Sequence, residues 1–167
     1  MDILPIVFFL TFSIYCSLAQ NCELPYSNTF FINSSSYIDI VDSNMQFIQK
    51  SIARTPHQAW TASIPNAEWI WSNNIRDFSS ASILNFGIEI QINSLLSSAI
   101  IKVAADNSAS VFVNNYNVES CKTFDFSIAT SCNVLMHLVI GVNSFRFEAT
   151  DAGGDAGLIF SIALYKN

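Results

Sequence analysis

Three tryptophans and the polar residues that follow them are the first candidates for ligand chemistry in this 167-residue chain. An indole ring can pack against the apolar face of a sugar ring, while amide and guanidinium groups hydrogen-bond its hydroxyls. Alternate side chains of a strand share a face, so Trp69 and Trp71 would point the same way. The candidate ligand-binding residues are Trp60, Trp69, Trp71, Asn73, Asn74 and Arg76. The alternative is that the indoles form core, as large aromatics in strands usually do.

A second set of candidates carries oxygen donors. Asp106 and Asn107 directly follow a strand-like run, and Asp151 and Asp155 bracket a glycine-rich turn. Carboxylate and amide oxygens are the ligands that Ca²⁺ prefers, so these four residues are candidate calcium ligands or partners of sugar hydroxyls. The alternative is turn chemistry, in which Asp and Asn side chains hydrogen-bond their own backbone.

The motifs of common enzyme classes are absent from the sequence. His57 and His137 are 80 positions apart and have no companion at zinc-ligand spacing. The sequence also lacks a Gly-x-Ser-x-Gly elbow and a phosphate-binding loop. Glycines 153, 154 and 157 lead into a strand-like run, so they would not place a helix N-terminus against a pyrophosphate. We therefore expect a protein that is not an enzyme.

Residues 1–19 are typical of a secretory signal peptide. The apolar segment Ile3–Ala19 is shorter than the ~20 residues of a membrane span, and Ser17 and Ala19 are small residues of the kind that a signal peptidase reads. No basic residue precedes this segment, although signal peptides usually carry one. We expect cleavage near Gln20, a secreted or cell-surface chain, and no membrane insertion afterwards. The alternative is an uncleaved anchor.

Cleavage would leave three cysteines, an odd number for an oxidising compartment. Cys121 and Cys132 are 11 positions apart and are the expected disulfide. Cys22 would then be unpaired, joined to another chain, or buried as a thiol. Asn33 begins an Asn-Ser-Ser sequon and is the candidate N-glycosylation site.

The charge of the chain bears on its partners. The formal net charge is −6, from 7 Lys and Arg against 13 Asp and Glu, and basic residues do not cluster. A nucleic-acid-binding protein needs a positive surface against phosphates, so we expect no such partner. The 51% hydrophobic and 13% aromatic content also excludes a disordered chain.

Apolar and polar residues alternate with a period of two along residues 88–92, 101–103 and 145–149, and four large apolar residues, Leu158, Phe160, Ile162 and Leu164, share one parity near the C-terminus. This pattern is typical of antiparallel strands with one buried face. Asn114-Asn115 suits a two-residue hairpin turn, because Asn tolerates positive φ. Asp42–Ile52 comes nearest to a helical pattern, and a short helix there is an alternative to strands.

Strands at this spacing, without intervening helices, predict an all-β protein: an antiparallel β-sandwich or jelly roll. Residues 20–59 are the least regular part of the mature chain. We expect them to add N-terminal strands and a loop to the sandwich core of residues 60–167.

Several of these segments together carry a resemblance. They are Ala67-Glu68-Trp69-Ile70-Trp71, Ala104-Ala105-Asp106-Asn107 and Val113-Asn114-Asn115. The set resembles the galactose-binding-domain-like β-sandwiches, including accessory domains of rhamnosidase-type glycoside hydrolases, over residues 60–167. Those modules often show an Ala-x-Trp-Ile-Trp strand, an Ala-Asp-(Asp/Asn) strand end and a Val-Asn-Gly hairpin, whose glycine is replaced here by Asn115. The resemblance implies a galactose-binding-domain-like fold and a module that binds carbohydrate without catalysis.

Two functions follow from these patterns. The first is a secreted, non-catalytic, lectin-like module that binds glycans or glycoproteins on cell-surface or extracellular material. The second is a structural subunit of an extracellular coat, matrix or fibre. Its N-terminal strand near residues 29–32 would add to a neighbouring copy in a homo-oligomer, and Cys22 would lock the contact.

Overall fold

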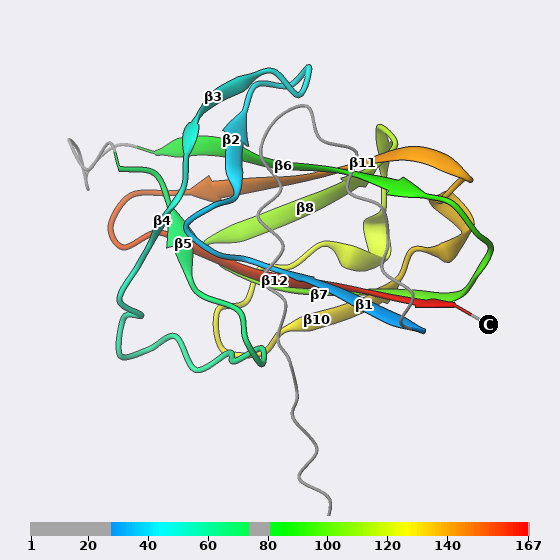
Figure 1. Cartoon of the computed structure of the whole chain (residues 1–167). Coiled ribbons are helices and arrows are strands. Elements are labelled where there is room, and N and C mark those ends of the chain that lie inside the picture. The colour runs from blue at the N-terminus through cyan, green and yellow to red at the C-terminus, as the bar shows by residue number, and fades with distance from the viewer. Residues whose placement is uncertain (1–27, 74–80, 167) are drawn as a thin grey trace, which may run out of the picture.

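The computed structural model describes residues 28–73 and 81–166, which form an antiparallel β-sandwich (Figure 1). Sheet I runs in the order β10 (Thr130–Asn133), β7 (Leu96–Asp106), β12 (Gly157–Lys166), β5 (Ile70–Trp71) and β4 (Ile52–Ala53), and β1 (Thr29–Asn33) also pairs with β12. Sheet II runs in the order β3 (Phe47–Lys50), β2 (Asp39–Val41), β6 (Ser82–Ile92), β11 (Gly141–Asp151), β8 (Ser108–Val113) and β9 (Tyr116–Asn117). Two 3₁₀ helices, η1 (Glu119–Cys121) and η2 (Leu135–His137), lie in the connections. No helix in the described ranges is long and apolar enough to cross a membrane.

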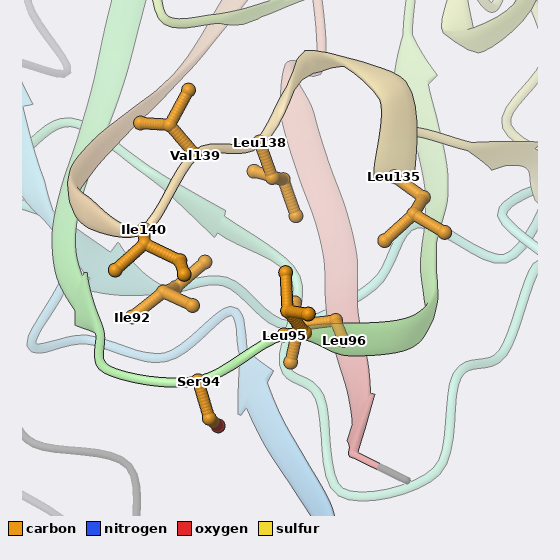
Figure 2. A pocket seen from close by; sticks show the side chains of 8 residues that line it. All are labelled: Ile92, Ser94, Leu95, Leu96, Leu135, Leu138, Val139 and Ile140. Carbon is orange, nitrogen blue, oxygen red and sulfur yellow. The ribbon is translucent and has the colours of Figure 1, made fainter.

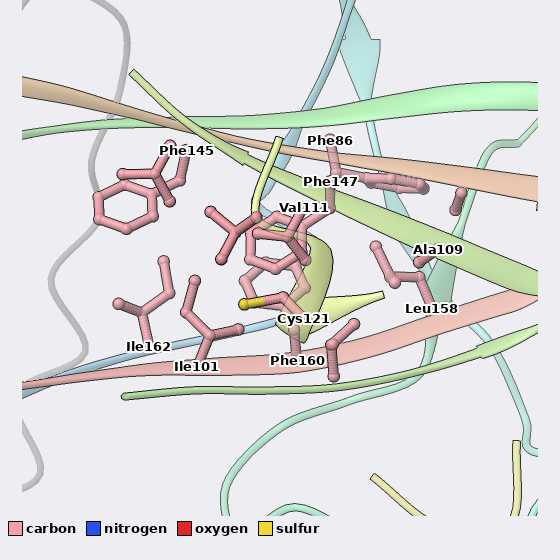
Figure 3. Packing of buried hydrophobic residues seen from close by; sticks show 14 of the residues in the cluster. Phe86, Ile101, Ala109, Val111, Cys121, Phe145, Phe147, Leu158, Phe160 and Ile162 are labelled. Atoms are coloured by element: carbon pink, nitrogen blue, oxygen red, sulfur yellow. The ribbon is translucent and has the colours of Figure 1, made fainter. Parts of the chain in front are cut away.

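The main core lies between the two sheets and follows from the alternation in the sequence. Along β11, Phe145, Phe147 and Ala149 point inward and are fully buried, while Arg146 and Glu148 lie on the outer face. Phe147 stacks on Phe160 of the opposite sheet, with 4.0 Å between ring centroids (Figure 3). Full burial of such a side chain contributes about 1.5–3 kcal/mol. The expected all-β sandwich is confirmed.

A second hydrophobic cluster covers the outer face of sheet I. Ala104 and Ile159 point away from the main core and pack against the irregular segment that precedes β5. This segment supplies four buried residues: Trp60, Ala62, Ile64 and Trp69. Residues 157–164 of β12 are therefore buried on both faces, whereas the shared parity of the large apolar residues in that run predicted one apolar face.

The N-terminal part of the described chain contributes strands to both sheets. β1 pairs with β12 in sheet I, and β2 pairs with β6 in sheet II. The helix considered for residues 42–52 is wrong, because β2 and β3 form a hairpin there. Asp42 Oδ1 accepts hydrogen bonds from the backbone N–H groups of Asn44 and Gln46, at 2.8 and 2.9 Å, and so closes the turn.

The hairpin turn predicted at Asn114-Asn115 is confirmed. Both residues have positive φ, at 49° and 67°. The turn joins β8 to β9, with Val113 opposite Tyr116. Asn accommodates this left-handed backbone better than most other non-glycine residues.

Candidate functional site

The three tryptophans are buried, with exposures of 6% for Trp60, 4% for Trp69 and 7% for Trp71. Trp60 and Trp69 pack together on the outer face of sheet I, 4.6 Å apart between centroids, and Trp71 packs against Phe86 in the main core. None of these indoles offers a ring face to a ligand, so the core alternative holds and the stacking platform does not form. Trp69 and Trp71 also lie on opposite faces of sheet I, whereas the strand pattern predicted a shared face. The physical reason is the apolar outer face of sheet I, which recruits the segment before β5.

Gly157 makes room for this packing. A Cβ at this position would lie 2.7 Å from Cζ3 and Cη2 of Trp60, which is closer than such atoms approach in proteins. The absence of a side chain at Gly157 therefore lets the indole of Trp60 lie close to the backbone of β12. Of the polar residues predicted to assist the indoles, Asn73 is exposed, whereas Asn74 and Arg76 lie outside the described residues.

Asp106 and Asn107 lie where the chain passes from sheet I to sheet II. Asp106 Oδ2 accepts a hydrogen bond of 2.7 Å from Trp60 Nε1. Asn107 Oδ1 accepts one of 2.6 Å from the backbone N–H of Ala152, and the Asn107 N–H donates to the Thr150 carbonyl at 2.9 Å. These side chains therefore tie together two neighbouring connections at one end of the sandwich.

Asp151 and Asp155 lie at this same end. Asp151 is buried, and its Oδ1 accepts a hydrogen bond of 2.8 Å from the Gly153 N–H, as in a turn. Asp155 lies on the surface, with Oδ2 3.9 Å from Nε2 of His57. Within residues 28–73 and 81–166, no three His, Cys, Asp or Glu side chains are grouped so that they could hold a metal ion. The contacts of Asp106, Asn107 and Asp151 are those of packing and turns.

The cysteine prediction is confirmed where the structure describes it. Cys121 and Cys132 form a disulfide with 5.2 Å between their Cα atoms, which joins η1 to β10 in the interior. Cys22 lies outside the described residues. Asn33 is half-buried at the end of β1 and pairs with Ser161 of β12. Its glycosylation stays a prediction.

The other end of the sandwich carries an exposed aromatic residue that sequence reasoning did not select. Tyr116 is 67% exposed, and its ring lies 6.0 Å from that of His137 with 33° between the planes. Next in the sequence, Asn117 Nδ2 donates a 2.6 Å hydrogen bond to Glu119 Oε1, and both side chains are exposed. Tyr116 therefore presents an aromatic ring to solvent, on a segment that also exposes an amide and a carboxylate.

A hydrogen-bonded pair of asparagines, Asn114 and Asn143, supports this aromatic ring. Asn114 Nδ2 donates to the His137 carbonyl at 2.8 Å and to Asn143 Oδ1 at 2.9 Å. Asn143 is fully buried, and its Nδ2 donates to the carbonyls of Val139 and Gly141 at 2.8 and 3.0 Å. The β8–β9 turn and residues 137–141 are thereby held together, so His137 is positioned against Tyr116 before any ligand arrives.

The sequence contained only part of the signal for this site. Tyr116 directly follows the Asn-Asn turn, and this position indicates an aromatic side chain at the end of a hairpin. His137 lies 21 positions further along the chain, and no local pattern places it beside Tyr116.

Comparison with known proteins bears on the fold. No protein-family model matches the chain, and no curated protein matches it. The α-L-rhamnosidase of Streptomyces avermitilis, solved with L-rhamnose, is similar with a TM-score of 0.52 and 22% identity, over 67% of this chain and 12% of that enzyme. The similarity thus involves a small part of the enzyme. The feature that the two chains share is the β-sandwich fold, which the sequence predicted.

Two further solved structures are similar at lower TM-scores. The GH26-CBM35 β-(1,4)-mannanase of Podospora anserina has a TM-score of 0.47 and 17% identity, over 84% of this chain and 28% of that one. A family 35 carbohydrate-binding module of Clostridium thermocellum has a TM-score of 0.44 and 13% identity, over 80% of this chain and 97% of that one.

Proposed function

We propose that this chain is a secreted, non-catalytic module that binds carbohydrate at the end of the sandwich where Tyr116 and His137 lie. The observation that carries the proposal is the 67% exposed ring of Tyr116, backed by His137. The apolar face of a pyranose ring packs on such an aromatic surface. The exposed oxygens of Asn117 and Glu119, which follow Tyr116 in the sequence, can accept hydrogen bonds from sugar hydroxyls.

The hydrogen bonds behind the site pre-organise it for binding. Asn114 and Asn143 hold both elements of the site in place, so little ordering accompanies binding. The rhamnosidase that shares this fold was solved with L-rhamnose, which makes rhamnose a sensible first probe. The partner we infer is a glycan or glycoprotein at the cell surface or in the extracellular space.

The structural-subunit alternative receives no such support. It required the strand near residues 29–32 to join a neighbouring copy. In the structure, β1 pairs with β12 of its own chain over five residue pairs, from Thr29 with Tyr165 to Asn33 with Ser161. One hydrogen-bonding edge of β1 is therefore already paired within its own chain.

The test is a glycan array probed with the protein displayed multivalently, followed by titration of any bound sugar. Tyr116→Ala should weaken binding about tenfold, since a lost aromatic contact and its buried area are together worth about 1.4 kcal/mol. Tyr116→Phe keeps the ring and should bind nearly as the parent does. Phe124→Ala is the matched control, because Phe124 is 70% exposed and lies outside the site.

Absence of binding by folded protein to any glycan would overturn the proposal. Equal binding by Tyr116→Ala and the parent would overturn the assignment of the site. In the latter case, sugar binding would have to involve another surface of the sandwich.

A further inference from the structure

A cavity of about 240 Å³ lies between the start of β7 and residues 135–140, the segment that contains His137 (Figure 2). Seven of its eight lining residues are leucine, isoleucine or valine, among them Leu95, Leu135, Leu138 and Ile140, and the eighth is Ser94. An apolar cavity of ~150 Å³ is large enough to admit benzene. The volume of the cavity can therefore hold part of a hydrocarbon chain, and the aliphatic side chains that line it favour such an occupant.

The 3₁₀ helix η2 joins this cavity to the aromatic site. A 3₁₀ helix has three residues per turn, so positions i and i+3 lie on the same side. Leu135 begins η2 and Leu138 directly follows it, with its N–H donating to the Leu135 carbonyl at 3.2 Å, and both side chains line the cavity. His137, which lies between them in the sequence, contacts Tyr116. One short segment thus forms a wall of the cavity and the backing of the proposed sugar platform.

The rim of the cavity is apolar and exposed. Leu95 is 74% exposed, Val139 55% and Ile140 62%, and Met136, which follows the lining residue Leu135 in the sequence, is 86% exposed. Figure 2 shows Val139 and Ile140 on one side of the hollow and Leu95 facing them across it. Large aliphatic groups clustered in water mark a surface that binds an apolar partner.

The two segments that line the cavity also lack charge. Residues 90–101 and 126–145 contain no Lys, Arg, Asp or Glu, although the whole chain has 7 basic and 13 acidic residues. An anionic headgroup would find no basic partner among the lining residues, and the net charge of −6 would oppose its approach. The charge pattern therefore favours an uncharged amphiphile.

We propose that this end of the sandwich binds a neutral glycolipid displayed in a lipid surface. The sugar headgroup packs on Tyr116, and part of the aliphatic chain enters the cavity beside Leu138. The exposed side chains of Met136 and Val139 contact the lipid around it. The headgroup contact rests on the carbohydrate binding proposed above, whereas the chain contact rests on the cavity itself.

The test is co-flotation of the full chain with phosphatidylcholine vesicles, with and without galactosylceramide or glucosylceramide. We expect binding to depend on the glycolipid. Leu95→Asn and Ile140→Asn should each weaken it about tenfold, the loss expected when roughly two methylene groups lose their apolar contact. Both positions are exposed, so these variants should fold. Ile128→Asn is the control, because Ile128 is 70% exposed and does not line the cavity.

A second measurement locates the chain directly. Octyl glucoside below its micellar concentration should shift the methyl NMR resonances of Leu135 and Leu138, whereas methyl glucoside should leave them unchanged. Unshifted resonances with both compounds would overturn the cavity as a chain site.

The outcomes separate this inference from the proposed function. If free glycans bind through Tyr116 but the Leu95 and Ile140 variants float with glycolipid vesicles as the parent does, the glycolipid inference is wrong and the carbohydrate function stands. If vesicles without glycolipid are bound equally well, the ligand is a lipid surface alone and the inference is also wrong. If neither free glycans nor glycolipid vesicles bind, both proposals fall.

Discussion

The indole Nε1 of Trp60 donates a hydrogen bond of 2.7 Å to Oδ2 of Asp106, across 46 positions of sequence. The sequence had placed these residues in two separate sites, one for stacking against sugar and one for calcium. In the fold they satisfy each other, since a buried indole N–H needs an acceptor. The bond fastens the segment before β5 to the end of β7 and covers the outer face of sheet I.

Asp106→Ala should lower the free energy of unfolding by about 1–3 kcal/mol, because it leaves the buried Trp60 N–H without its partner. Trp60→Phe removes the donor and leaves the carboxylate without its partner. Urea denaturation of both single variants and the double variant measures the coupling between them. We expect the double variant to lose less stability than the two single variants together. Strict additivity would show that the hydrogen bond contributes nothing.

Asn143→Ala should affect both the stability and the proposed sugar binding. The substitution removes four hydrogen bonds of a fully buried amide, and each buried group left unpaired costs about 1–3 kcal/mol. His137 would then lose its fixed position against Tyr116, so glycan affinity should fall although Asn143 does not contact the sugar. Urea denaturation and glycan titration test the two effects, with Ser131→Ala at an exposed position of β10 as control. Unchanged affinity in folded protein would separate the asparagine pair from the site.

Removal of the disulfide should destabilise the sandwich without abolishing it. Replacing Cys121 and Cys132 with alanine should cost about 2–4 kcal/mol, the range typical of such bonds, while the paired sheets still provide the core. The measurement is the midpoint temperature of thermal unfolding, with and without reductant. Reductant should lower the midpoint of the parent protein and leave that of the double alanine variant where it is. A parent insensitive to reductant would contradict this expectation.

The hydrogen bonds of Asp125 lead us to expect that the stability of the loop between η1 and β10 depends on pH. Hydrogen bonds from the hydroxyl and backbone N–H of Ser127, at 2.5 and 2.6 Å, hold the pKa of Asp125 below its ordinary value of 3.8. Because the folded pKa is depressed, these contacts stabilise the loop above the unfolded value and are lost as pH falls through the folded one. Carboxyl NMR titration should give a midpoint below 3.8, and Ser127→Ala should raise it. A midpoint unmoved by that substitution would rule out the hydroxyl as the cause.

The fold was largely predictable from local patterns. Alternation through Phe145 and Phe147 predicted a strand with one buried face, and the Asn114-Asn115 pair predicted a two-residue turn. Both depend on backbone geometry within a few residues, which a sequence encodes directly. The disulfide was predictable as well, because Cys121 and Cys132 lie close in the chain.

The site depended on contacts between distant residues. A period of two shows which side chains share a face but not what covers the opposite one, so the sequence by itself left the indoles of Trp60 and Trp69 open to either core or surface. Tertiary packing buried them on sheet I. The same packing brought His137 to Tyr116 through the asparagine pair and left Leu95 exposed over a cavity. Local sequence determined the strands and turns of this protein. Which side chains contact each other across the sandwich and at each of its ends was decided only by tertiary packing, because these contacts join residues that are far apart in the chain.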